Sequence, residues 1–205
     1  MPRTADRLES PAHPFFPDMP RAKGERRLEI LKVLAQMLGE PRWARITTAA
    51  LAERLDVSEA ALYRHFASKA QMYEGLIEFI EQSVFGLANR ITAEEPEGPG
   101  QAVALLQMLL AFAEKNPGLV RVLTGEALVG EHERLQVRVN RFFDRFEATL
   151  KQSLRIASDA DAAARASVVL RYAIGSLQLY AKSGFANSPT EAFGAQRSQL
   201  IPGAG

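Results

Sequence analysis

Hydrophobic residues recur every three or four positions along most of this chain, which is the spacing of one face of an α-helix. Residues 24–39 form the first such stretch, and Gly39 and Pro41 mark its end as helix stop signals. A second stretch spans residues 69–91, and its apolar side carries Met72, Leu76, Phe79, Ile80 and Val84. The strict alternation of a half-buried strand is absent from the sequence. The pattern therefore predicts an all-α fold.

The second half of the chain predicts further helices. Residues 101–116 are apolar nearly all round, which indicates a helix enclosed by neighbours. A short helix is expected within residues 119–130, and residues 135–154 carry the one-sided apolar stripe of a long helix. We interpret the acidic segment at 131–133 as the solvated start of that helix. Residues 160–185 are apolar on more than one face, and residues 189–200 can add a last short helix.

Composition divides the chain into three parts. Residues 1–23 contain five prolines, which remove backbone donors and fix φ too often for regular structure, so we expect a disordered arm. The acidic, turn-rich segment 92–100 separates two helical regions. We assign residues 24–84 to an N-terminal domain and residues 85–205 to a helical regulatory and dimerisation domain. Dimerisation is expected because residues 161–184 are apolar on more faces than one chain can cover, and two copies would form a four-helix bundle.

Composition also excludes several classes of protein. The 205 residues include no cysteine, which rules out disulfides and thiolate metal sites and favours a reducing compartment. No apolar run approaches the roughly 20 residues that span a bilayer, and the first residues lack the order of a signal peptide. We therefore expect a cytoplasmic protein without a membrane anchor. The net charge of +1 argues against general coating of nucleic acid but allows a local basic face.

Two short helical patterns lie close together at residues 47–55 and 58–66. Thr47 or Thr48 can cap the first, and Ser58 can cap the second. Neither could be stable alone, but joined by a tight turn at Asp56 and packed on the first helix they make a helix-turn-helix motif over residues 47–66. The second helix of such a motif enters the DNA major groove. A generic helical hairpin is the alternative on these residues alone.

Charge favours the DNA-binding interpretation. Between residues 21 and 45, seven basic and three acidic side chains give a net charge of +4. The side chains suited to phosphate oxygens are Thr47, Thr48, Tyr63, His65 and Lys69. The positions expected to face base edges are Ser58, Glu59, Ala60, Ala61 and Arg64. Because two of these are alanines, we expect few base contacts.

The segment "ITTAALAERLDVSEAALYRHFASKAQMYEGLIEFIE" resembles the DNA-binding domain of the TetR family, and Leu62–Lys69 is close to the family's usual "LYxHFxxK". The resemblance implies a three-helix N-terminal domain on an all-helical C-terminal domain that forms a homodimer, binding palindromic double-stranded DNA on the nucleoid. This chain departs from the family pattern in three places. Asp56 replaces the usual turn glycine, the arm before Gly24 is extra, and the final twenty residues match only loosely.

Four segments, "SEAALYRHF", "LIEFIEQS", "EKNPGLVRVLTGEAL" and "ERLQVRVNRFFDRFEATLKQSLR", are more particularly similar to the nucleoid occlusion proteins of this family. That resemblance implies a protein that, when bound to DNA, disrupts polymers of the cell-division protein FtsZ. It also implies a groove for the FtsZ C-terminal tail between the last helix of the DNA-binding domain and the first helix of the C-terminal domain. In this chain the groove would be lined by Phe79, Met108, Ala111, Lys115 and Asn116. Phe79 and Met108 can equally be core residues, and Leu87 stands where family members carry an arginine, for which Arg90 could substitute.

A small-molecule-responsive repressor is the alternative function within the same family. Such a repressor needs an apolar cavity with converging polar groups, whereas the apolar residues of the segment 101–116 suggest a packed core. Those residues are Leu105, Leu106, Leu109, Leu110 and Phe112. Catalysis is not expected, because the three histidines His13, His65 and His132 form no zinc-binding or triad-like motif. We expect no cofactor and no metal.

Overall fold

The computed structural model describes residues 24–41, 45–94, 98–156, 161–191 and 193–203, and the secondary structure in these ranges is helical, without strands. The N-terminal part contains α1 (Glu25–Leu38), α2 (Thr48–Arg54) and α3 (Glu59–Tyr63), and α4 (Lys69–Glu94) follows them. The rest consists of α5 (Gly98–Lys115), α6 (Pro117–Leu123), the 3₁₀ turn η1 (Glu126–Leu128), α7 (Glu133–Ile156), α8 (Ala162–Lys182) and α9 (Phe193–Leu200). The all-α prediction is confirmed, and the expected arm at residues 1–23 lies outside the described residues.

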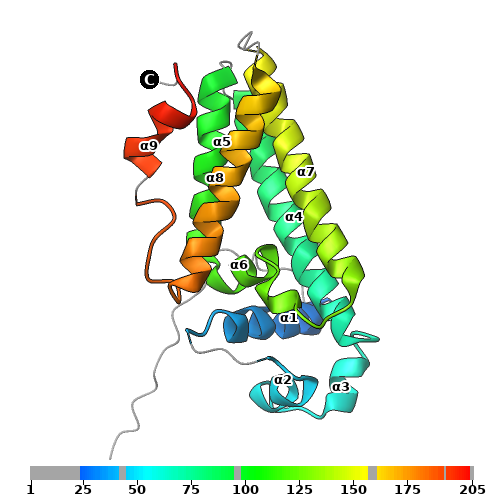
Figure 1. The fold of residues 1–205 in the computed structure, drawn as a ribbon. Coiled ribbons are helices and arrows are strands. Elements are labelled where there is room, and N and C mark those ends of the chain that lie inside the picture. Colours follow the sequence, from blue (N-terminus) through cyan, green and yellow to red (C-terminus); the bar gives the residue numbers. More distant parts are fainter. Residues whose placement is uncertain (1–23, 42–44, 95–97, 157–160, 192, 204–205) are drawn as a thin grey trace, which may run out of the picture.

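The helices form a small head and a long body (Figure 1). Helices α1, α2 and α3 lie at one end, and α4, α5, α7 and α8 run along the body as a bundle. Helix α6 lies across the foot of the bundle, against α1, and α9 lies beside the outer end of the bundle. Because α4 extends from the head well into the body, the boundary that we expected after residue 84 falls inside a continuous helix.

The short helices begin where their capping residues predict. The Thr47 hydroxyl accepts a hydrogen bond from the Ala50 amide at 3.1 Å, and the Ser58 hydroxyl accepts one from the Ala61 amide at 3.2 Å. Asp56, in the turn between α2 and α3, has a φ of 53°, so the predicted left-handed turn residue is confirmed. Helix α5 begins at Gly98, earlier than the apolar pattern indicated, because Pro99 fits the first turn of a helix.

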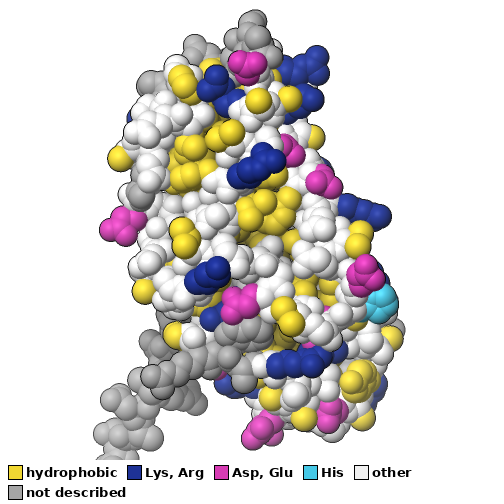
Figure 2. Space-filling model, in the orientation of Figure 1, with side chains coloured by type: hydrophobic (Ala, Val, Ile, Leu, Met, Phe, Trp, Pro, Cys, Tyr) yellow, Lys and Arg dark blue, Asp and Glu magenta, His cyan; other side chains and the backbone are white. Residues whose placement is uncertain are grey.

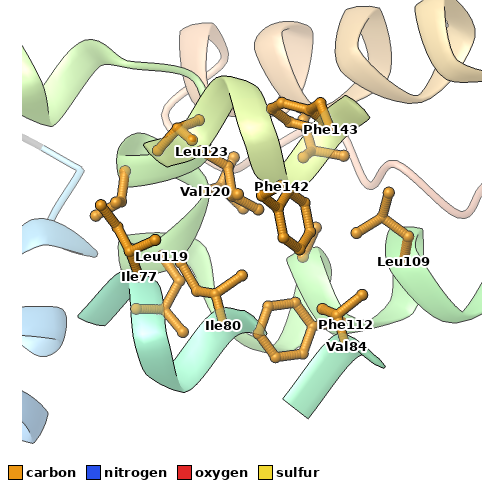
Figure 3. Close-up of a cluster of buried hydrophobic side chains, with 14 of the residues drawn as sticks. Ile77, Ile80, Val84, Leu109, Phe112, Leu119, Val120, Leu123, Phe142 and Phe143 are labelled. Carbon is orange, nitrogen blue, oxygen red and sulfur yellow. The ribbon is translucent and has the colours of Figure 1, made fainter. Parts of the chain in front are cut away.

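The core of the body is filled by apolar side chains from four helices (Figure 3). Helix α4 contributes Ile77, Ile80 and Val84, α6 contributes Leu119, Val120 and Leu123, and the Phe142 ring of α7 lies 5.4 Å from the Phe85 ring, centre to centre. The α5 residues that suggested a packed core are at most 3% exposed, namely Leu105, Leu106, Leu109, Leu110 and Phe112. The packed-core interpretation of this helix is therefore confirmed.

Helix α6 joins the body to the head through a close backbone contact. A Cβ atom at Gly118 would lie 1.9 Å from the Ala35 carbonyl oxygen of α1, so only glycine allows this approach. Arg121, 2% exposed, donates hydrogen bonds from its Nη1 to the carbonyls of Leu38 and Glu40 at the end of α1. Burial lowers the pKa of Arg121, and Glu126 partly offsets this effect. The Arg121 guanidinium therefore forms hydrogen bonds with backbone carbonyls at the end of α1, where the helix itself offers no donors.

Candidate DNA-binding and partner-binding sites

The structure brings the predicted base-reading residues together on the outer side of the head. Ser58, Glu59, Ala60 and Arg64 are exposed and Ala61 is half-buried, while Leu62 on the opposite side of α3 is buried in the core. The Ser58 hydroxyl uses an acceptor lone pair for the cap, and its hydrogen is still able to donate. Helix α3 thus presents a short polar and small-residue surface to solvent.

A hydroxyl and a carboxylate bind each other where α2 and α3 meet. The Thr48 hydroxyl donates to Glu59 Oε2 at 2.5 Å, which joins the first turns of the two short helices. Thr47, which is exposed, accepts from the Ala50 amide and keeps its hydroxyl hydrogen for another acceptor. Thr48 is therefore an internal contact of the motif as well as a candidate for phosphate binding.

At the far end of α3, Tyr63 is 46% exposed and His65 is half-buried. The His65 carbonyl accepts a hydrogen bond from Arg27 of α1, and the Arg27 guanidinium lies 4.1 Å from the centre of the Phe66 ring. Arg27 is one of the seven basic residues that give residues 21–45 their net positive charge. In the structure its guanidinium is used for contacts within the protein. Of the other six basic residues in that segment, the three at positions 21, 23 and 42 lie outside the described residues.

Lys69, the first residue of α4, is bound by a carboxylate from a distant part of the chain. Its Nζ lies 2.5 Å from Oε1 of Glu131, and Arg45 Nη2 lies 3.6 Å from the same oxygen. The Glu131 side chain is only 9% exposed, so the expectation that residue 131 is solvated is wrong. The acidic segment 131–133 gives no local signal of this contact, because both cations are more than sixty residues away. Burial, and secondarily Glu131, raises the pKa of nearby Tyr73.

Two further ion pairs join α4 to α7. Arg134 Nε lies 2.6 Å from Glu74 Oε1, and Arg138 forms a two-pronged pair with Glu81, with an Nη2 to Oε2 distance of 2.6 Å. The hydrogen bond to Glu81 raises the pKa of Arg138. Sequence reasoning singled out none of these four residues, since each pair spans more than fifty positions.

Of the residues expected to line a groove, Phe79 lies on α4, Met108, Ala111 and Lys115 lie on α5, which packs against α4, and Asn116 lies between α5 and α6. Phe79 and Met108 are partly buried and pack against the core, Ala111 is half-buried and Lys115 is exposed. Asn116 is 8% exposed, and its Nδ2 donates to the Phe112 carbonyl at 2.7 Å. The Asn116 amide is thus turned into the protein rather than toward a groove.

A surface hollow of about 390 Å³ lies farther along α4. It is lined by Gln82, Ser83, Gly86, Leu87 and Arg90, residues on successive turns of one side of the helix. Leu87 and Arg90, the position of the missing family arginine and its suggested substitute, therefore belong to one hollow.

Helix α8 carries exposed apolar residues on its outer side. Val168 is 53% exposed and Leu179 is 66% exposed, and nothing lies within 4 Å of where a Cβ at Gly175 would be. Figure 2 shows the face of the molecule on which α8 lies, and apolar side chains are visible along the middle of that face. Helix α7 instead exposes charged residues such as Arg141, Asp144 and Lys151. Among the described residues, α8 thus exposes its two large apolar side chains on one side, which also carries the exposed Arg171, whereas α7 exposes the single large apolar side chain Val137.

The part of the chain that the structure describes lacks two features of other protein classes. None of its helices is long and apolar enough to cross a membrane. In the same ranges, no group of three or more His, Asp or Glu side chains is placed to hold a metal ion.

Two family models match the chain. The model for bacterial regulatory proteins of the tetR family covers residues 30–76, and the SlmA-like model, described as a tetracyclin repressor-like C-terminal domain, covers residues 101–202. The matched residues include α3 and the beginning of α4 in one case and α5 to α9 in the other.

Curated relatives match over most of the length of both chains. The nucleoid occlusion factor SlmA of Idiomarina loihiensis is 48% identical over 87% of this chain and 94% of its own. The same factor from Alteromonas mediterranea is 47% identical over 85% of this chain and 93% of its own. That from Aliivibrio fischeri is 49% identical over 83% of this chain and 91% of its own.

Solved structures share the fold at lower identity. The MbdR regulator from Azoarcus sp. CIB has a TM-score of 0.72 at 19% identity, covering 89% of this chain and 98% of its own. The TetR family transcriptional regulator PfmR from Thermus thermophilus has a TM-score of 0.70 at 20% identity, covering 86% of this chain and 98% of its own. Both matched families consist of DNA-binding regulators, not enzymes, and TetR-family regulators act as dimers on DNA. The chain belongs to the SlmA nucleoid occlusion factors, within the TetR family of DNA-binding regulators.

Proposed function

We propose that this protein binds palindromic double-stranded DNA as a homodimer and, while bound, antagonises FtsZ polymerisation and Z-ring assembly over the chromosome. The observation that carries the proposal is the 47–49% identity to nucleoid occlusion factors across both the DNA-binding head and the helical body. A cytoplasmic, nucleoid-associated location follows from this activity.

The head supports the DNA part of the proposal. Helix α3 presents its outer side with the set Ser58, Glu59, Ala60, Ala61 and Arg64 available to base edges. Around it, the set for phosphate oxygens is Thr47, Thr48, Tyr63, His65 and Lys69. Because α3 has only five residues and two of them are alanines on that side, phosphate contacts should supply most of the affinity.

The outer side of α8 supports the homodimer. Exposed Val168 and Leu179, with open space at Gly175, lie on one side of α8 together with Arg171, and a second copy would cover this largely apolar strip. Pairing two copies there would place two α3 helices on one side of the dimer, about one DNA turn apart. Light scattering that shows a monomer at micromolar concentration would contradict both the dimer and the palindrome.

The α4–α5 side of the body supports a site for the FtsZ C-terminal tail. An extended peptide binds through an apolar anchor and polar groups at the rim. Phe79, Met108 and Ala111 supply partly buried apolar surface, and Lys115 supplies a cation near the end of α5. Because the Asn116 amide is bound to the Phe112 carbonyl, we assign Asn116 to the floor of this region.

The test is sedimentation of FtsZ polymers with GTP, with and without this protein and with and without its DNA site. We expect less FtsZ in the pellet when protein and DNA are both present. The variant Lys115→Ala should keep DNA binding but weaken this effect, whereas Lys151→Ala, an exposed lysine on α7, should behave as wild type. If FtsZ pelleting is unchanged in all four wild-type conditions, the FtsZ proposal is wrong and a small-molecule-responsive repressor becomes the leading hypothesis.

A further inference from the structure

We propose that Glu131 is an internal competitor of DNA, an anion from the helical body that occupies Lys69, a residue of the proposed phosphate-binding set, and the neighbouring Arg45 when DNA is absent. The inference rests on the proposed DNA-binding site, since it assumes that phosphates approach the beginning of α4. It adds a residue outside the helix-turn-helix motif that sets how tightly the protein binds DNA.

The contact has the geometry of a specific pair. Lys69 Nζ and Glu131 Oε1 are 2.5 Å apart, with side-chain exposures of 20% and 9%. Arg45, whose side chain is 67% exposed, lies 3.6 Å from the same carboxylate and donates to the Gly130 carbonyl at 3.0 Å. Gly130 has a φ of 74°, a left-handed conformation that glycine adopts without strain. The turn before α7 therefore holds two cations of the head with one carboxylate and one carbonyl.

The Glu131 pair differs from the two neighbouring ion pairs in which element supplies the cation and which supplies the carboxylate. In the Arg134–Glu74 and Arg138–Glu81 pairs, α7 supplies the cation and α4 the carboxylate. At Glu131 the order is reversed, because the carboxylate comes from the turn before α7 and the cations come from the head. Pairs of the first kind hold α4 to α7 without using a cation of the head, whereas the Glu131 pair does use one.

The position of Lys69 makes the competition direct. Lys69 is three residues beyond Phe66 and begins α4, and in Figure 1 this end of α4 lies beside α3 and near the beginning of α7. An ammonium group has three donors, so Lys69 could contact a phosphate and Glu131 together, but the phosphate would then lie close to a carboxylate that little water screens. Bound DNA should therefore weaken the Glu131 contact, and the contact should weaken DNA binding.

The test compares Glu131→Gln with wild type by fluorescence anisotropy over a salt series. Two duplexes of equal length serve as probes, one selected by the wild-type protein from a random pool and one unrelated. We expect Glu131→Gln to bind both duplexes tighter by a similar factor, on the order of 3- to 10-fold at low salt, with a salt slope steeper by up to about one. The matched control Glu74→Gln removes a carboxylate from the same helix pair but should leave DNA affinity unchanged.

A double-mutant cycle assigns the effect to Lys69. In a Lys69→Ala background, the gain from Glu131→Gln should shrink, because one of its two cations is gone.

An unchanged or weaker DNA affinity of folded Glu131→Gln overturns the competition, as does a gain in affinity equal to that of Glu74→Gln. If thermal melting shows that Glu131→Gln does not fold, Glu131→Asp, which draws the carboxylate back from Lys69, should show a smaller gain, and no gain overturns the proposal. Failure of wild type and variant alike to bind any duplex overturns the DNA-binding site as well, whereas loss of the gain alone overturns only the competition.

Discussion

The head and the body of this protein meet at two junctions that use different interactions. At the α1–α6 junction, the backbones touch at Gly118 and Ala35, and the buried Arg121 donates to the last carbonyls of α1. At the α4–α7 junction, the end of the interface nearer the head carries partly exposed ion pairs, Arg134 with Glu74 and Arg138 with Glu81, beyond the buried contact of Phe85 with Phe142. The Arg121 side chain of the first junction is buried, whereas the charged side chains of the second are partly exposed.

The difference indicates which junction can respond to the surroundings. Close backbone packing changes little with salt or with a nearby phosphate, because it depends on shape. Partly exposed ion pairs are screened by salt and compete with other ions. We therefore expect the α1–α6 junction to fix the head on the body at any salt concentration, and the charged junction to weaken as the salt concentration rises.

The largest effect is expected from Gly118→Ala. The new Cβ would lie 1.9 Å from the Ala35 carbonyl oxygen and 2.9 Å from the Gly39 nitrogen, and both are backbone atoms that cannot move aside as a side chain can. We expect a loss of roughly 3 kcal/mol or more in the free energy of unfolding, measured in urea at two salt concentrations. Gly86→Ala on α4 is the control, because its Cβ would meet nothing within 4 Å and alanine favours a helix. Equal stability of the two variants would show that the α1–α6 contact is not tight.

Arg121→Met should have the next largest effect. Methionine keeps much of the side-chain volume but removes the donors to the Leu38 and Glu40 carbonyls. It also removes the guanidinium that lies 4.5 Å from the centre of the Phe185 ring. We expect about 2–4 kcal/mol of destabilisation, because buried carbonyls lose their partner. Urea unfolding should show the same loss at low and high salt. An Arg141→Met control on the exposed side of α7 should change stability by less than about 0.5 kcal/mol.

The smallest effect is expected from Glu81→Gln at the charged junction. Its side chain and that of Arg138 are 26% and 32% exposed, so solvent already weakens the pair. We expect a loss of about 1 kcal/mol or less at low salt, which falls toward zero near roughly 0.5 M salt because the pair is screened. A loss that is independent of salt, or larger than that of Arg121→Met, would remove the distinction between the two junctions.

Local features of the fold were predictable because their causes are local. Thr47 and Ser58 cap the helices that follow them, and Asp56 takes the left-handed turn, since each of these depends on atoms within a few residues. The beginning of α5 was placed three residues late, because the apolar pattern does not report a first turn made of Gly98, Pro99 and Gly100.

Several features of the site could not be predicted. The Asn116 amide turns inward to donate to the Phe112 carbonyl, one turn earlier in α5, and the Glu131 side chain is largely covered where it meets two distant cations. The hollow on α4 that contains Leu87 and Arg90 depends on which side of that helix the body leaves uncovered.

The sequence by itself determined the all-α fold, the helix-turn-helix motif and the outward set on α3, because helical periodicity, caps and turn residues act over a few positions. Only the tertiary structure decided which cations of the head remain open to DNA. Arg27 is bound to the His65 carbonyl, and Lys69 and Arg45 are held by Glu131. Such pairings depend on the packing of helices far apart in the chain, so they cannot be predicted from the local pattern of charges.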